Sequence, residues 1–236
     1  MAYSLSNRVQ KVKPSPTLAI TAKAAELKAS GKDVIGLGAG EPDFDTPDHI
    51  KQAAIEAIHA GFTKYTAVDG TASLKAAIIN KYQRDNGLEY QPDEILVSCG
   101  GKQSFYNLCQ AIINPGDEVV IPAPYWVSYP DMVLLADGVP VIVEAGLAQR
   151  FKITPEQLDE AISDKTRLFV INSPSNPTGV AYTRKELAEL GEVLRKYPDI
   201  IIATDDMYEH ILWSKESFSN ILMVCPDLRE RTLALN

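Results

Sequence analysis

Ile200-Ile-Ile-Ala-Thr-Asp205-Asp206-Met207-Tyr208 is the stretch of sequence that decides the fold. It begins as a continuous apolar, β-branched run, which is typical of a strand with both faces buried. Similar short runs recur along the chain, separated by longer stretches of helical pattern. Strands that alternate with helices predict an α/β fold, a mainly parallel sheet sandwiched by helices. The predicted strands are residues 95–98, 118–121, 139–143, 168–172, 200–204 and 232–236.

The N-terminal region has a different pattern. Residues 1 to about 16 are polar and contain Pro14 and Pro16. Thr17 then precedes an Ala-rich helical stretch that ends near Gly31, so we expect Thr17 to cap a helix. We interpret the first residues as an arm that leads into this helix.

Composition and charge narrow the classes of function. The 236 residues are 45% hydrophobic and 23% charged, as in ordinary soluble globular proteins. A formal charge of −8 without a basic stripe argues against nucleic acid or a membrane as main partner, and favours a small molecule. No segment reaches the roughly 18 apolar residues that span a bilayer, and the N-terminus lacks the apolar core of a signal peptide, so we expect a cytoplasmic protein. The three cysteines form no C-x-x-C pair, which predicts buried free thiols and no metal site.

The carboxyl ends of the predicted strands are where a ligand is expected, because open α/β sheets bind ligands in that crevice. After residues 95–98 comes Cys99-Gly100-Gly101-Lys102, which opens a helical stretch through Ile113. Glycines let the backbone approach a ligand closely, and the N–H groups and dipole of a helix start suit a phosphate. The alternative is an ordinary tight turn.

Acidic and hydroxyl groups follow the strand of residues 200–204. A carboxylate such as that of Asp205 can meet a ring nitrogen and keep it protonated, which makes a pyridine ring an electron sink. Tyr208 can offer its hydroxyl to a phenolate oxygen of the same ring. The alternative is that Asp205 or Asp206 caps the next helix, a common role for aspartate after a strand.

Two further segments lie at strand ends. Prolines flank Asn176 in Ser173-Pro174-Ser175-Asn176-Pro177, a stiff loop that can include a cis bond and fix an amide at the edge of the sheet. Trp126, in Pro124-Tyr125-Trp126, can lay its indole on an aromatic ligand. The alternatives are a bare turn for the loop and a large core residue for Trp126.

Together these segments resemble the motifs of class I, fold-type I aminotransferases, enzymes that use pyridoxal 5'-phosphate. The similarity is greatest to bacterial aspartate and prephenate aminotransferases and covers essentially the whole chain. Several independent motifs in the same order make a chance match implausible. The segments are Leu37-Gly-Ala-Gly40-Glu-Pro-Asp-Phe44, Lys64-Tyr65-Thr66, Gly100-Gly101-Lys102, Pro124-Tyr-Trp126, Asn172-Ser-Pro-Ser-Asn176-Pro-Thr-Gly179 and Asp205-Asp-Met-Tyr208.

The resemblance implies roles for particular residues. Residues 1–46 would form an N-terminal arm and the start of a small domain, and residues 47–236 a cofactor-binding large domain that is incomplete at its C-terminal end. Tyr65 would reach the phosphate in the neighbouring subunit, which implies a homodimer, and Gly40 would close over the substrate. The implied cofactor-binding set is Gly100, Gly101 and Lys102 at the phosphate, Trp126 stacked on the ring, Asn176 and Tyr208 at the phenolic oxygen, and Asp205 at the ring nitrogen, with Asp206 as its bystander.

The resemblance also suggests a dicarboxylic substrate. In the bacterial enzymes a serine, a threonine and a lysine at the positions of Ser15, Thr17 and Lys102 surround the distal carboxylate of aspartate or glutamate. Two hydroxyls and an ammonium suit a carboxylate, because charge-assisted hydrogen bonds are strong. Trp126, Asn176 and Gly40 complete the implied substrate-binding set. The alternative makes Thr17 a helix cap and Ser15 a solvated loop residue.

The family's Schiff-base lysine does not match any lysine of this sequence. It is expected just after Asn236, about four residues beyond the end, so no catalytic residue is assigned and the chain alone is expected to be inactive. The predicted strand of residues 232–236 has no following helix, which favours a truncated chain. Two other interpretations stay open: a prephenate or aromatic aminotransferase of the same family, and a non-catalytic remnant retained for binding or dimerisation.

Overall fold

The computed structural model describes residues 4–38, 40, 42 and 44–236. The chain forms two compact units, one made of Met1–Val12 with Asp69–Asn236 and the other of Lys13–Val68. The first unit contains the sheet and most of the predicted site residues. The second contains the two helices α2 (Pro16–Ala29) and α3 (Asp48–His59).

The first unit is built on a five-stranded parallel sheet with the order β2-β1-β3-β4-β5. This confirms the predicted α/β fold with a parallel sheet flanked by helices, and five of the six predicted strands. The strands are β1 (Glu118–Ala123), β2 (Val139–Glu144), β3 (Thr166–Asn172), β4 (Ile201–Asp205) and β5 (Thr232–Leu235).

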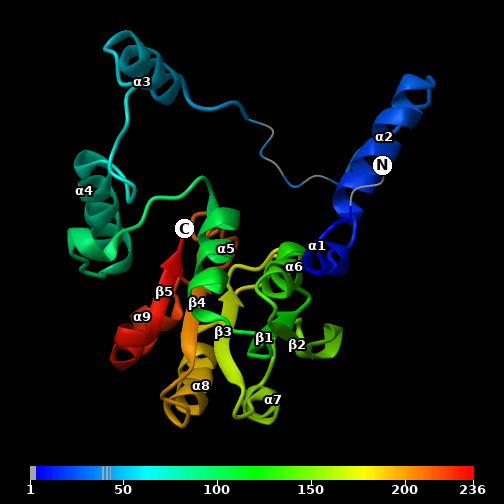
Figure 1. Ribbon diagram of the computed structural model, residues 1–236, viewed down its shortest axis with the longest axis vertical. Helices are drawn as coiled ribbons and strands as arrows, with labels where there is room; N and C mark the ends of the chain where they lie inside the picture. Colours follow the sequence, from blue (N-terminus) through cyan, green and yellow to red (C-terminus); the bar gives the residue numbers. More distant parts are fainter. Residues whose placement is uncertain (1–3, 39, 41, 43) are drawn as a thin grey trace. The chain divides into compact units, whose positions relative to one another are not determined.

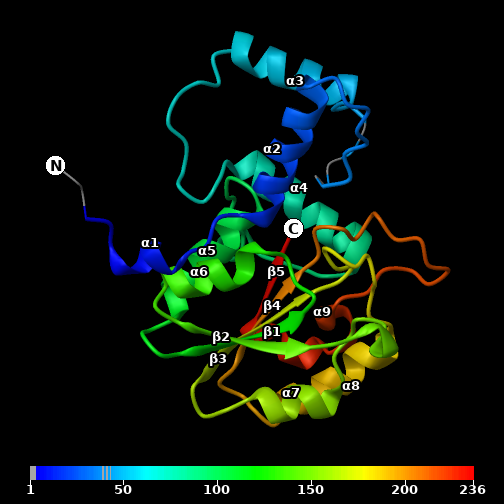
Figure 2. The same ribbon diagram turned by 90° about the vertical axis from the view of Figure 1, so that its right-hand side faces the viewer.

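Helices cover both faces of this sheet (Figures 1 and 2). On one face, Phe169 and Ile202 pack with buried leucines of α7 (Pro155–Ala161) and α8 (Arg184–Arg195) and with α9 (Ile221–Val224). On the other face, Val170 and Ala203 pack against α5 (Gly101–Ile112) and α6 (Ser128–Leu135). Neighbouring residues of β3 and β4 thus enter different cores, which explains why these strands are apolar throughout.

The remaining elements of the first unit are short. The π-helical turn η1 continues directly from α4, and η2 precedes the segment that leads to α5. They are α1 (Asn7–Lys11), α4 (Ala72–Lys81), η1 (Tyr82–Asn86), η2 (Pro92–Glu94), η3 (Leu147–Gln149) and η4 (Pro226–Arg231).

Helix starts follow local capping chemistry. Thr183 begins α8 with a capping box, in which its hydroxyl accepts from the N–H of Glu186 and the glutamate returns to the N–H of Thr183 at 2.7 Å. Thr154 and Gln157 form the same arrangement at α7. These caps satisfy N–H groups that have no acceptor within a helix.

The prediction of a strand at residues 95–98 is wrong. These residues precede α5 without belonging to a strand, and the N–H of Val97 donates to the carbonyl of Asp69 at 3.0 Å. A strand requires a hydrogen-bonded neighbour, and within the described ranges none lies beside this segment. An apolar β-branched run predicts an extended backbone but does not supply the partner.

The prediction of Thr17 as a helix cap is also wrong. Helix α2 begins one residue after Ser15, whose hydroxyl accepts from the N–H of Leu18 at 3.4 Å. Ser15 is therefore the N-cap, and Thr17 lies in the first turn. Its end at Ala29 agrees with the prediction near Gly31.

The cysteines and the helices bear on two further expectations. Cys109 and Cys225 are buried free thiols as predicted, whereas Cys99 is exposed, because it lies in the open turn before α5. Across the part of the chain that the structure describes, no helix is long and apolar enough to cross a membrane.

Candidate functional site

The carboxyl ends of β3 and β4 bring two predicted segments together. Asn172 and Asp205 are register partners, and the Asn172 side-chain amide donates to the Asp205 carbonyl at 3.0 Å. The Oδ1 of Asn172 accepts from the N–H of Asn176 at 2.7 Å. One side chain thus joins the strand end of β4 to the loop that follows β3.

Asn176 and Tyr208 meet at this edge of the sheet. The Nδ2 of Asn176 donates to the hydroxyl of Tyr208 at 3.3 Å, and both side chains are half-buried. The Ser173–Pro174 and Asn176–Pro177 peptide bonds are both cis, which confirms the predicted cis geometry in this loop. The pair places an amide and a phenol hydroxyl side by side from segments 32 residues apart.

Asp205 is held through both carboxylate oxygens. Oδ2 accepts from the hydroxyl of Tyr129, and Oδ1 accepts from the N–H of Met207 at 3.3 Å. Burial raises the pKa of Asp205, while the two donors act in the opposite direction. Residues 207–210 form a turn and no helix begins there, so the alternative of a helix cap at Asp205 or Asp206 is wrong.

Asp206 points into the interior. It is 1% exposed and accepts from the hydroxyl of Thr204 at 2.7 Å and from the Nδ2 of Asn220 at 2.6 Å. Burial raises its pKa to about 7. Its acceptor capacity is used inside the protein, as a structural neighbour of Asp205 requires.

The Gly100-Gly101 pair begins α5 as predicted. Gly100 is the N-cap with φ +85°, a conformation that L side chains rarely adopt. A Cβ on Gly101 would meet the Cε of Met207 at 3.3 Å, so the start of α5 lies against the turn after β4. The first N–H groups of a helix have no intrahelical acceptor and can bind an anion.

Lys102 and Trp126 form a further part of this region. The Lys102 Nζ lies 5.2 Å from the centroid of the Trp126 ring, a cation–π contact. Trp126 packs edge-on against Tyr129, with ring centroids 5.3 Å apart. Trp126 is partly buried against the core of α5 and α6, so it combines the two roles that the sequence left open.

Tyr129 is a site residue that the sequence analysis missed. It lies three positions after Trp126 in the first turn of α6, and its hydroxyl reaches Asp205 on a different strand. The spacing of the two aromatic residues was a usable signal, but pairing with Asp205 depends on the sheet order.

The other predicted residues belong to the unit Lys13–Val68. Ser15 caps α2, Thr17 lies in its first turn, and Gly40 lies between α2 and α3. Tyr65 is exposed in the segment after α3. Their proposed contacts with cofactor and substrate stay predictions.

The donor set of the first unit fits a phosphorylated pyridine. A carboxylate matches a protonated ring nitrogen, an amide and a phenol hydroxyl match a phenolic oxygen, an indole offers a flat surface, and a glycine-led helix start matches a phosphate. A metal is not indicated: no group of three or more potential ligands occurs in the described ranges.

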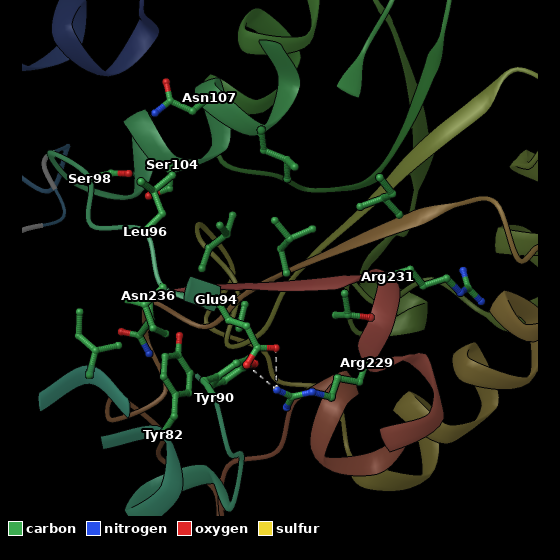
Figure 3. A pocket seen from close by; sticks show the side chains of 18 of the residues that line it. Tyr82, Tyr90, Glu94, Leu96, Ser98, Ser104, Asn107, Arg229, Arg231 and Asn236 are labelled. Carbon is green, nitrogen blue, oxygen red and sulfur yellow. Dashed lines mark hydrogen bonds and ion pairs between the residues drawn. The ribbon is translucent and has the colours of Figure 1, made fainter. Parts of the chain in front are cut away.

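A hollow of about 950 Å³ lies elsewhere, along the outer edge of β5 (Figure 3). Leu233, Leu235 and Leu96 are among its lining residues, and Arg229 bridges to Glu94 at 3.0 Å within it. The lining includes none of Asp205, Asn176, Tyr208 or Trp126, so this hollow is distinct from the site described above.

Comparison with known proteins gives the same answer as the site. The family model for aminotransferase class I and II matches residues 32–234. The aspartate/prephenate aminotransferase of Nitrosomonas europaea is 69% identical over 232 residues, covering 98% of this chain and 58% of the relative. That of Cereibacter sphaeroides is 60% identical over 236 residues, covering 100% of this chain and 59% of the relative.

Solved structures agree. The aspartate aminotransferase of Rhizobium meliloti superimposes with a TM-score of 0.94 at 48% identity, covering 98% of this chain and 58% of that one. The aspartate aminotransferase of Thermus thermophilus with maleate gives 0.92 at 46% identity, covering 99% and 60%. The chain thus spans little more than half the length of the relatives it matches. It belongs to the family of class I and II aminotransferases.

Proposed function

We propose that this chain supplies the cofactor-binding part of a pyridoxal-phosphate-dependent aminotransferase that exchanges an amino group between aspartate or glutamate and a 2-oxo acid. The observation that carries the proposal is the convergence of Asp205, the Asn176–Tyr208 pair and the start of α5 at one edge of a parallel sheet. The family to which the chain belongs generally uses pyridoxal phosphate.

The cofactor, when bound, supplies a carbonyl carbon that takes up the amino group and a pyridine ring that withdraws electrons. Asp205 would hold a proton on the ring nitrogen, which makes the ring a stronger electron acceptor. Its carboxylate is already fixed at both oxygens, so little reorientation is needed.

The other residues would orient the ring. Asn176 and Tyr208 would donate hydrogen bonds to the phenolic oxygen, and Trp126 would stack on the ring and keep water from one face. Gly100, Gly101 and Lys102 would bind the phosphate, through helix N–H groups and through an ammonium.

The substrate would be dicarboxylic. Ser15, Thr17 and Lys102 would bind its distal carboxylate, while Trp126, Asn176 and Gly40 would contact the remainder. Support comes from the names of the relatives, which include aspartate, and from a solved relative described with maleate, itself a dicarboxylate. Tyr65 would serve the phosphate of the partner subunit in a cytoplasmic homodimer.

The covalent step needs a lysine that no residue of this chain supplies. We propose that the 236 residues alone do not transaminate. In the proposed division, residues 1–46 form the arm and the start of the small domain and residues 47–236 the incomplete large domain.

Prephenate is the favoured second candidate substrate, because relatives that are 69% and 60% identical carry both substrates in their names. Assays with glutamate as amino donor and either oxaloacetate or prephenate as acceptor separate the two. A remnant used for binding or dimerisation would show amino transfer with neither.

The test is carried out on the natural polypeptide. Its intact mass is measured, and pyridoxal 5'-phosphate is titrated in while absorption is recorded before and after borohydride. Cofactor binding, a reducible band and amino transfer from aspartate support the proposal, and the absence of cofactor binding overturns it. Asp205→Asn is expected to weaken cofactor binding at least about tenfold, since it removes a charge-assisted hydrogen bond. Asp164→Asn, at an exposed position, is the matched control.

A further inference from the structure

Tyr129 lies between the aromatic core and the strand end that carries Asp205. It is 2% exposed and begins α6 as its second residue. Its ring meets Phe105 edge-on with centroids 4.8 Å apart, and Trp126 edge-on at 5.3 Å. A ring held on two sides in a close-packed interior has one accessible orientation, so the hydroxyl is fixed in space.

The hydroxyl of Tyr129 donates to Oδ2 of Asp205, while the N–H of Met207 takes Oδ1. The two donors come from different elements, α6 and the turn after β4. They fix the plane of the carboxylate as well as its position. Burial and the nearby Asp205 raise the pKa of Tyr129 well above its usual range, so it stays a donor.

We propose that Tyr129 is a positioning residue: its hydroxyl sets the orientation of the Asp205 carboxylate, and its ring couples that carboxylate to the Trp126 indole. The inference rests on the proposed function, because Asp205 and Trp126 are the groups that would hold the cofactor ring. It adds a residue that the motifs do not identify, and it makes α6 a second support for the site beside the sheet.

A purely structural role for Tyr129 is the competing explanation. Tyr182 offers a matched control, because it is also a buried tyrosine whose hydroxyl has a single recorded partner, the N–H of Ile153 at 2.9 Å. It lies in the core on the opposite face of the sheet. Tyr129→Phe and Tyr182→Phe each keep the ring and remove one buried hydroxyl, so their losses of stability should be similar.

The first readout needs no cofactor. The Asp205 carboxyl carbon is labelled with carbon-13, assigned with Asp205→Asn, and titrated by NMR. Loss of the Tyr129 donor should raise the titration midpoint by about one pH unit, because a hydrogen bond to a carboxylate favours its charged form. Tyr208 and Asp206 are the other titratable groups near this pair, and they are unchanged in the variant. Tyr182→Phe should leave the midpoint unchanged.

The second readout is cofactor affinity of the natural polypeptide. Tyr129→Phe should weaken binding of pyridoxal 5'-phosphate about tenfold, and Tyr182→Phe should not. A shifted midpoint with no cofactor binding by any form supports the positioning of Asp205 and refutes the proposed function. An unchanged midpoint in a folded Tyr129→Phe refutes the inference whatever the affinity.

Phe105→Leu is a second variant that keeps the hydroxyl and loosens one side of the ring. It should move the Asp205 midpoint in the same direction by a smaller amount. It therefore keeps the inference testable if Tyr129→Phe does not fold. No shift in Phe105→Leu, in that case, counts against the inference.

Discussion

The Nδ2 of Asn220 lies 2.6 Å from Oδ2 of Asp206, and both side chains are 1% exposed. The N–H of Asp206 donates in turn to the carbonyl of Leu235 at 2.8 Å. Asp206 therefore joins the end of β4 to the end of β5 and to the start of α9, which Asn220 caps. This network supports the residue next to Asp205 from the side away from the proposed cofactor.

Because burial raises the pKa of Asp206 to about 7, its ionisation should destabilise the fold. An acid whose folded pKa lies above its unfolded value near 3.9 contributes stability that is present below the unfolded pKa and lost as pH rises through the folded one. We expect this group to lower the free energy of unfolding by up to about 4 kcal/mol between pH 4 and 8. Urea unfolding at a series of pH values measures the change.

Asp206→Asn keeps the shape and the bond from Asn220, so it should flatten this pH dependence. Asp164→Asn, at the surface, should leave the dependence as it is. Equal slopes in Asp206→Asn and in the unmodified chain would show that Asp206 does not titrate in this range.

Gly191 should resist substitution even though it lies inside α8. A Cβ there would lie 2.4 Å from the Sγ of Cys225, a buried thiol of the same core. We expect Gly191→Ala to cost about 1–2 kcal/mol, since the clash outweighs a gain of roughly 1 kcal/mol in helix propensity.

The double variant Gly191→Ala with Cys225→Ala removes the clashing sulfur. Its loss of stability should be smaller than the sum of the two single losses by about 1 kcal/mol or more. Additive losses in urea unfolding would mean that the thiol is not what excludes a side chain at residue 191.

Arg231 satisfies the carbonyl groups at the end of α8. Its guanidinium donates to the carbonyls of Leu194 at 2.7 Å, Tyr197 at 3.1 Å and Ile200 at 2.6 Å. Arg231→Met should destabilise the protein by about 2–3 kcal/mol, because it leaves these acceptors without a donor. Arg231→Lys, with fewer donors and no planar fork, should recover only part of the loss, as thermal unfolding would record. A loss within error for Arg231→Met would contradict the prediction.

Asn172 should matter for cofactor binding although no role at the ligand is proposed for it. Its side chain joins the carbonyl of Asp205 to the N–H of Asn176. Asn172→Ala should free the loop that carries Asn176 and weaken binding of pyridoxal 5'-phosphate several-fold, as equilibrium dialysis of the natural polypeptide would show. Asn172→Asp keeps the acceptor for Asn176 and should lose less. Unchanged affinity in Asn172→Ala would mean that the prolines alone hold the loop.

The strands of the sheet were predictable because burial on both faces leaves a clear mark on sequence. Each strand of the parallel sheet alternates between two cores, so the apolar run has no polar interruption. The start of α5 and the residues after β4 were also predictable, since parallel strands carry their ligand groups at one edge.

Contacts between distant segments were not predictable. Residues 95–98 carry the composition of a strand, but pairing is decided by neighbours. Ser15 and Thr17 are both capable caps, and the backbone chose the earlier one. The bond from Tyr129 to Asp205 joins residues 76 positions apart and depends on how α6 lies over β4.

The outer edge of β5 has a consequence for handling the protein. Within the described ranges β5 is the last strand of the sheet, and the hollow beside it is lined by Leu233, Leu235 and Leu96. A strand edge with free N–H and C=O groups beside an apolar surface is a template for any extended polypeptide. A preparation limited to these 236 residues should therefore associate edge to edge as its concentration rises, and colloidal stability would limit work with it before its chemistry does.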